Sequence, residues 1–206
     1  MSNGNRVKSL SGKLAVILTV AGLSFMVSAP AHAAGGLRFE EMKCEFTEGG
    51  DGGPASPYFV LFTGRPDGTT TTTMIRKPWW DNNCEDGYVS KPQQLISANI
   101  PNNTFYMAAL IEEDVDPDLY QAQINGINSI LKQKWQSART KTQLQQYNTM
   151  APALADAVQD RLGNDDFHDV DGGWVNTQSG WLYPLHFEDG DPDESTTLVR
   201  VWLRMV

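Results

Sequence analysis

The order of hydrophobic periods along the chain is the feature that most constrains its fold. Runs with the pattern of β-strands lie near both ends, and residues at helical spacing occur only in the middle. The segment 199–205 is the clearest case, because apolar side chains alternate strictly with others there, as in a strand with one buried face. A doubly wound parallel sheet requires strands and helices to alternate in the order β-α-β-α, and this chain does not have that order. The pattern therefore predicts a mostly β fold, an antiparallel β-sandwich with a two-helix insertion.

Further segments have the pattern of strands, namely 38–47, 58–63, 69–75, 104–111 and 181–187. Two of them, with the sequences YFVLFT and TFYMAALI, are continuous apolar runs, which is typical of core strands. Apolar residues at helical spacing over 124–135 and 144–162 predict two amphipathic helices. We expect Pro152 to kink or restart the second helix, and Gly163 to cap its C-terminal end.

The first 33 residues have the three-part layout of a secretory signal peptide. A basic region with three positive charges and no acid is followed by an apolar run over 14–27 and by the small-x-small site Ala31-His32-Ala33. We expect cleavage after Ala33 and a secreted protein, periplasmic or extracellular. Removing 33 of the 206 residues leaves 173, and the lost positive charges take the net charge from −9 to −12. The remaining residues, 34–206, should form a single domain with its helical insertion at about 119–163.

Charge and cysteine content limit the class of protein further. A net charge of −12 argues against binding to nucleic acid or to an anionic membrane, because both require a cationic face. After position 27 no apolar run approaches the roughly 18 residues of a transmembrane segment, so none is expected. Cys44 and Cys84 are the two cysteines, and an exported protein folds in an oxidising compartment. We therefore expect a Cys44–Cys84 disulfide, which would contribute about 4 kcal/mol in the chain-entropy model.

Acidic residues are concentrated in four groups, which we expect to lie in loops or at strand ends. The groups are Asp114, Asp116 and Asp118; Asp189, Asp191 and Asp193; Asp165, Asp166, Asp169 and Asp171; and Glu48 with Asp51. Carboxylates at alternate positions of a turn can face one hard cation, and calcium takes six to eight oxygen ligands. The spacing is not that of an EF-hand, because Leu119 and Glu194 stand where the sixth loop position requires glycine. Composition and placement favour calcium, and the alternative is a set of solvated acidic loops.

Three segments, in this order, resemble parts of C2 domains. The run 55–60, ASPYFV, resembles their S-D-P-Y-V strand start; 77–82, KPWWDN, resembles N-P-x-W-N-E; and 105–118 resembles a strand that enters a D-x-D-x-x-x-D calcium loop. The resemblance covers about 65 residues and implies an antiparallel sandwich that binds calcium between loops at one end, and often lipid or protein as well. Ser56 stands where C2 domains usually carry a ligand aspartate, the helical pair is foreign to that fold, and the net charge disfavours a basic lipid-binding face.

The resemblance implies that the metal ligands are Asp51, Asp114, Asp116 and Asp118. The clustering of acids adds Asp189, Asp191 and Asp193 to this set. Together with the calcium site, we expect the protein to be an interaction or effector module at a surface, rather than an enzyme. Its ligand could be a protein, a glycan or a lipid headgroup.

Two other functions remain open. The six tryptophans all follow the leader, and Trp79, Trp80 and Trp174 lie near predicted loops, where an indole face could pack against the apolar side of a sugar. This would make the chain a carbohydrate-binding module, unless these side chains only anchor the core. A secreted hydrolase could use carboxylates or His168, although there is no G-x-S-x-G motif and a lone histidine beside acids is more often a surface residue.

Overall fold

The structure of the protein is a computed structural model. It describes residues 35–46, 57–76, 87–112, 119–163, 165–175, 180, 182, 184–189 and 197–206. All of them belong to the compact unit Ala31–Val206. The predicted signal peptide and its cleavage site lie outside these residues. No helix in the described part of the chain is long and apolar enough to cross a membrane.

The described residues form nine strands and two helices. In order these are β1 (Gly35–Phe46), β2 (Pro57–Gly64), β3 (Thr70–Ile75), β4 (Val89–Ser90), β5 (Gln94–Ile100), β6 (Phe105–Glu112), α1 (Gln121–Ala138), α2 (Gln143–Gln159), β7 (Asp166–Trp174), β8 (Leu185–Asp189) and β9 (Thr197–Met205). One antiparallel sheet has the order β4-β1-β9-β8, with β5 also paired to β1, and the other has the order β3-β2-β6-β7. The predicted fold class is therefore confirmed as mostly β, with two antiparallel sheets and two helices inserted between β6 and β7.

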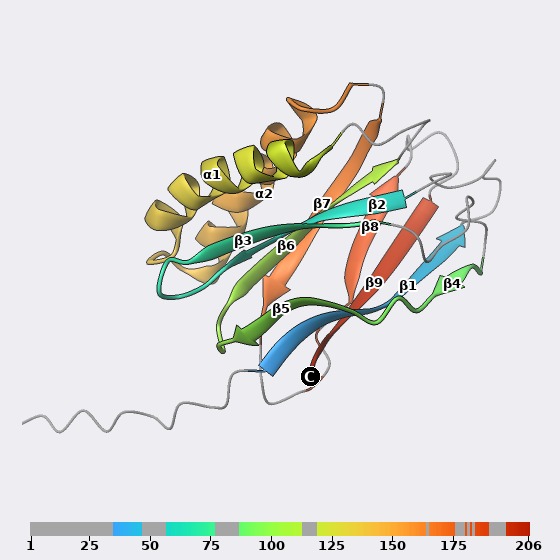
Figure 1. Ribbon diagram of the computed structural model, residues 1–206, viewed down its shortest axis with the longest axis horizontal. Helices are drawn as coiled ribbons and strands as arrows, with labels where there is room; N and C mark the ends of the chain where they lie inside the picture. The colour runs from blue at the N-terminus through green and yellow to red at the C-terminus, as the bar shows by residue number, and fades with distance from the viewer. Residues whose placement is uncertain are drawn as a thin grey trace, which may run out of the picture. The chain divides into compact units, whose positions relative to one another are not determined.

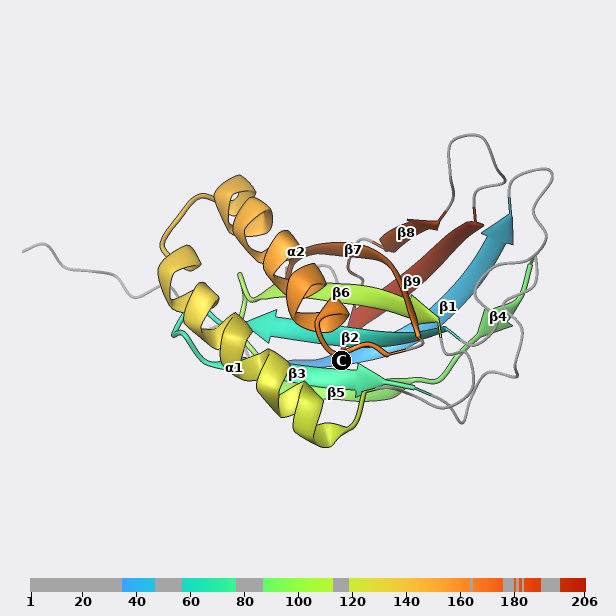
Figure 2. The ribbon, with the colours of Figure 1, turned by 90° about the horizontal axis from the view of Figure 1, so that it is seen from above.

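The β3-β2-β6-β7 sheet is the middle layer of three. The helices cover one of its faces, and the sheet that contains β1 and β9 covers the other (Figures 1 and 2). Every residue of β2 is buried, and alternate side chains belong to different cores: Phe59 and Leu61 face the other sheet, while Val60 and Phe62 face the helices. This explains why the β2 and β6 sequences are continuously apolar instead of alternating.

The helical layer is held to the middle sheet by one aromatic contact in particular. The Trp135 ring of α1 stacks on Phe105 of β6 with centroids 5.5 Å apart, and its indole N–H donates to the Arg65 carbonyl at 2.9 Å. The indole lies directly over Gly64 of β2, where an added Cβ would be 2.6 Å from the ring. Glycine is therefore required there for the helix to approach the strand this closely.

The second helix differs from its prediction in three respects. It continues through Pro152 without interruption, because Pro152 lies on the exposed side of α2, where water can bond the carbonyl that loses its partner. It ends at Gln159 with Asp160 as its cap, so Gly163 is not the C-cap. Leu144, which we placed on the apolar face, is 70% exposed, because it belongs to the first turn and points away from the sheet.

The acidic group at 165–171 was predicted to lie in a loop or at a strand end, and this was wrong for Asp169 and Asp171. Residues 166–174 form β7, which pairs with β6 along its whole length. The strand pattern is broken by a bulge, because Leu110 pairs with Asp169 and Ile111 with Phe167, so that His168 has no opposite residue. The two short strands β4 and β5 were not predicted either, since β5 buries only Ile96 and Ile100.

Candidate functional site

The outer edges of the two sheets, β7 and β8, are joined by aspartate side chains. Asp169 accepts the Val170 N–H on one carboxylate oxygen at 2.6 Å and the Glu188 N–H on the other at 3.3 Å. Asp171 does the same one step further along, with the N–H groups of Gly172 at 2.7 Å and His186 at 2.8 Å. Each carboxylate thus bridges one N–H of β7 and one of β8. We call these two bridges the carboxylate seam.

The seam is partly desolvated, and this changes the pKa of Asp169 and of the adjacent Tyr147. Burial raises the pKa of Asp169, against the opposing effect of the N–H groups of Val170 and Glu188 that bond its charged form. Tyr147 of α2 donates its hydroxyl to Asp171 at 3.4 Å, and burial together with the negative charge of Asp171 raises the pKa of Tyr147 to about 12. Backbone N–H groups and the Tyr147 hydroxyl therefore stabilise the negative charge of the two carboxylates.

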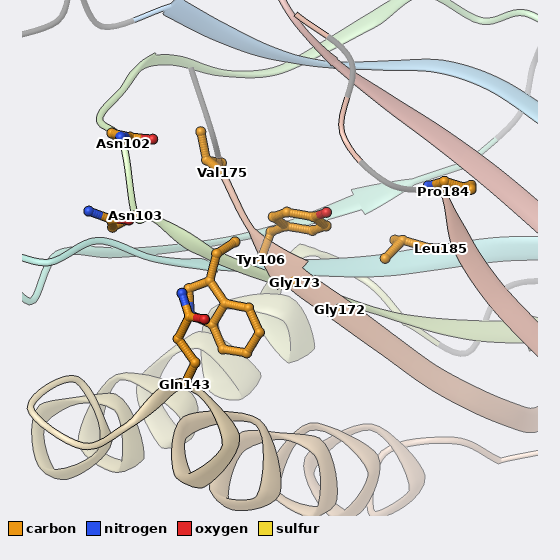
Figure 3. Close-up of a pocket in the computed structure, with 10 residues that line it drawn as sticks. Asn102, Asn103, Tyr106, Gln143, Gly172, Gly173, Val175, Pro184 and Leu185 are labelled. Atoms are coloured by element: carbon orange, nitrogen blue, oxygen red, sulfur yellow. The ribbon is translucent and has the colours of Figure 1, made fainter. Parts of the chain in front are cut away.

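A pocket of about 660 Å³ opens where the seam stops. A third bridge would need an acceptor side chain two residues after Asp171 and an N–H group two residues before His186. These positions are Gly173, which has no side chain, and Pro184, which has no N–H. Neither half of a third bridge can therefore form. Figure 3 shows the residues around this opening, which are Asn102, Asn103, Tyr106, Gln143, Gly172, Gly173, Trp174, Val175, Pro184 and Leu185.

None of these ten lining residues carries a charge at neutral pH. Asn102 and Asn103 come from the turn between β5 and β6, where Asn103 has a φ of 60°, a conformation that asparagine tolerates better than most residues. Gln143 is the first residue of α2 and is exposed. These three amides supply both donors and acceptors to an otherwise apolar pocket.

Tyr106 lies directly opposite Gly173 in the β6–β7 pairing, and its ring fills the space that a side chain on Gly173 would take. A Cβ added to Gly173 would be 2.9 Å from the Tyr106 hydroxyl oxygen. The residue is only 2% exposed, and burial, together with the charge of Asp171, raises the pKa of its hydroxyl. That hydroxyl points across the opening toward Leu185 (Figure 3), and it has no hydrogen-bond partner in the described part of the chain.

Trp174 anchors the core and also lines the pocket. Its ring packs on Phe105 with centroids 5.3 Å apart, and its indole N–H donates to the Gln146 side-chain oxygen at 2.8 Å. It therefore anchors the helical layer while also lining the pocket. Trp79 and Trp80 lie outside the described residues.

Most of the predicted metal ligands also lie outside the described residues. These are Asp51, Asp114, Asp116, Asp118, Asp191 and Asp193. Asp189 is the last residue of β8, and only its backbone is described. Within the described ranges, no group of three or more His, Cys, Asp or Glu side chains is placed to hold a metal ion.

His168 differs from the surface residue that its sequence context suggests. The bulge in β7 turns it toward Glu112, with Nε2 3.3 Å from Oε2, and its side chain is 7% exposed. His186 lies in β8, as predicted, and is exposed. Asp165, which belongs to the acidic group at 165–171, is buried and accepts a hydrogen bond of 2.7 Å from the Tyr58 hydroxyl.

Cys44 is fully buried in β1, and the described residues include no free cysteine. Its partner in the predicted disulfide, Cys84, lies outside them.

Comparison with protein-family models and with curated protein sequences finds no match to this chain.

The seam predicts that Asp169→Asn destabilises the protein by about 1–3 kcal/mol, because an amide NH₂ would face an N–H donor in place of an acceptor oxygen. Asp156→Asn on the exposed side of α2 is the matched control and should change the unfolding free energy by less than about 0.5 kcal/mol. Urea unfolding at pH 7 measures both. Equal stability of the two variants would contradict the bridging role of Asp169.

The same variant tests the titration of Asp169. Since its pKa is raised in the folded state, the folded protein binds this proton more tightly than the unfolded chain does. Its contribution to stability is therefore greatest at low pH and is lost as the pH rises through the folded pKa. The difference in unfolding free energy between the parent protein and Asp169→Asn should be larger at pH 4 than at pH 7.

Proposed function

We propose that this protein is a secreted binding module that takes a neutral, hydroxyl-rich ligand, a carbohydrate, in the pocket beside β7. The observation that carries the proposal is the hydroxyl of Tyr106, a residue only 2% exposed, which faces the pocket without a hydrogen-bond partner in the described chain. Such a hydroxyl can bond directly to a ligand that fills the pocket.

The pocket's size and lining support the same ligand class. Its volume of about 660 Å³ lies within the range of small-molecule sites. The amides of Asn102, Asn103 and Gln143 can donate to and accept from sugar hydroxyls, and Trp174 adds an aromatic surface. The absence of charge among the ten lining residues favours a neutral ligand over an ionic one.

The first test is binding of a panel of neutral mono- and oligosaccharides, measured by calorimetry and by tryptophan fluorescence. Gln143→Ala should weaken the binding of any sugar found by about threefold to tenfold, which corresponds to one lost hydrogen bond. Gln121→Ala removes the same side chain from the first position of α1 and should leave the affinity unchanged. If no neutral sugar binds, or if the two variants are equally affected, the proposal is wrong.

A calcium site at one end of the sandwich is a second proposal, and the positions of the strand ends favour it. Pro57, Glu112 and Asp166 are aligned in one sheet, and Phe46, Thr197 and Asp189 in the other. Phe59 and Phe187 contact each other at 5.5 Å, so these ends of the two sheets coincide. The segments 47–56, 113–118 and 190–196, which carry six of the seven predicted ligands, all start from this end. A C2-like architecture is proposed with it.

For calcium, the melting temperature of the protein without its leader should be compared in EDTA and in millimolar calcium. A site with a Kd one hundredth of the free calcium concentration adds about 2.7 kcal/mol to the unfolding free energy. The double variant Asp114→Ala/Asp116→Ala should lose this gain, whereas Asp156→Ala, with its carboxylate on α2, should keep it. An unchanged melting temperature would remove calcium from the proposal.

We also propose the Cys44–Cys84 disulfide and export through the leader. In support of the bond, Cys44 exchanges backbone hydrogen bonds of 2.9 Å with Tyr88 and Gly87, and Cys84 precedes Gly87 by three positions, a reach of at most about 11 Å. Mass spectrometry after alkylation of the unfolded, unreduced protein should show no alkylated cysteine. Two alkylated thiols would exclude the bond.

A further inference from the structure

We propose that the ligand completes the carboxylate seam. An uncharged oxygen of the ligand lies over Gly173, accepts the backbone N–H of Trp174 and bonds to the Tyr106 hydroxyl. This makes Tyr106 the residue that determines specificity for a hydroxyl-bearing ligand. The inference rests on the proposed function and assigns the atoms that recognise the ligand.

The direction of the backbone groups of β7 supports the first bond. In an antiparallel pair, successive N–H groups point alternately toward the partner strand and away from it. Val175 donates to the Thr104 carbonyl at 2.8 Å, so its N–H points inward, while the N–H groups of Val170 and Gly172 point outward to the seam. The N–H of Trp174 therefore points outward as well, into the pocket.

Each outward N–H of the seam is bonded by the side chain that precedes it. Asp169 precedes Val170 and Asp171 precedes Gly172, but the residue before Trp174 is Gly173, which offers no acceptor. An acceptor oxygen from outside the chain can take that position.

A second donor lies at the same place. In the existing bridges the second donor is a β8 N–H, from Glu188 or His186. Pro184 has none, but the Tyr106 hydroxyl lies within 2.9 Å of the position that a Cβ of Gly173 would occupy. A ligand oxygen on this side of Gly173, farther out than a Cβ would lie, would meet both the Trp174 N–H and this hydroxyl, whereas each aspartate accepts its two donors on separate oxygens.

The neighbouring charge decides which oxygen fits. Asp171 is the last bridge of the seam, and its carboxylate lies near enough to Tyr106 to affect the titration of the hydroxyl. A ligand carboxylate at the third position would be repelled by Asp171 in a partly desolvated site, whereas a hydroxyl accepts the same bonds without that cost. The site should therefore prefer a neutral sugar to the matching uronic acid.

The test uses Tyr106→Phe with the sugar that binds most tightly in the panel. We expect about threefold to tenfold weaker binding, with a free-protein stability equal to or above that of the parent, because the removed hydroxyl has no partner in the described chain. Tyr58→Phe is the matched control, since this buried hydroxyl bonds Asp165 and neither lines the pocket nor contacts the seam. It should leave the affinity unchanged.

Two further measurements complete the experiment. In ¹⁵N-labelled protein, the Trp174 amide should shift on sugar binding, and the corresponding uronic acid should bind more weakly than the neutral sugar.

If Gln143→Ala weakens binding while Tyr106→Phe does not, the ligand occupies the pocket away from the seam, so the inference fails and the proposed function stands. If no sugar binds the parent protein, both fail. A Tyr106→Phe protein that is less stable than the parent would show a structural bond and also overturn the inference.

Discussion

The burial of the β3-β2-β6-β7 sheet on both faces is the constraint on which the rest of the structure depends. A sheet whose central strands have no polar side needs a cover on each face, since apolar surface left in water costs about 25 cal/mol per Å². The β1–β9 sheet provides one cover and the helical pair provides the other. The helices are therefore part of the core of this fold, although they interrupt the strands in the sequence. Trp135, seated on Gly64 and Phe105, fixes how closely they approach.

Strand β7 of the middle layer contacts both other layers, and this explains why the pocket forms beside it. It pairs with β6 on one side, α2 packs on its outer face, and the seam ties its free edge to β8. The N-terminal half of α2 contributes Gln143 to the lining, Gln146 to Trp174 and Tyr147 to Asp171. Strand β7 is thereby fixed on both sides of the pocket. The proposed ligand needs little reorganisation of the protein, which favours affinity because less ordering accompanies binding.

Periodicity in the sequence predicted the strongly patterned elements and the fold class, because a large buried face leaves a regular trace. It failed for β7, where Asp169 and Asp171 look like loop residues, although the strand pairs with β6 along its length and their carboxylates bond N–H groups of β8. Trp174 was considered as a possible ligand platform and lines the pocket, whereas Tyr106 was not singled out. The apolar run TFYMAALI gives no sign that the Tyr106 hydroxyl faces a pocket, because this depends on Gly173 lying opposite Tyr106 in β7. The predicted acidic metal ligands stay a prediction.

Pro184 has a consequence for the topology as well as for the pocket. If the seam extended by further bridges, the edges of β7 and β8 would be joined along their length and the two sheets would close on this side like a barrel. A proline at that position removes the donor that the next bridge requires, and Gly173 removes the acceptor. The two sheets thus stay separate beyond Asp171, and the opening between them there is set by two residues that cannot form a bond.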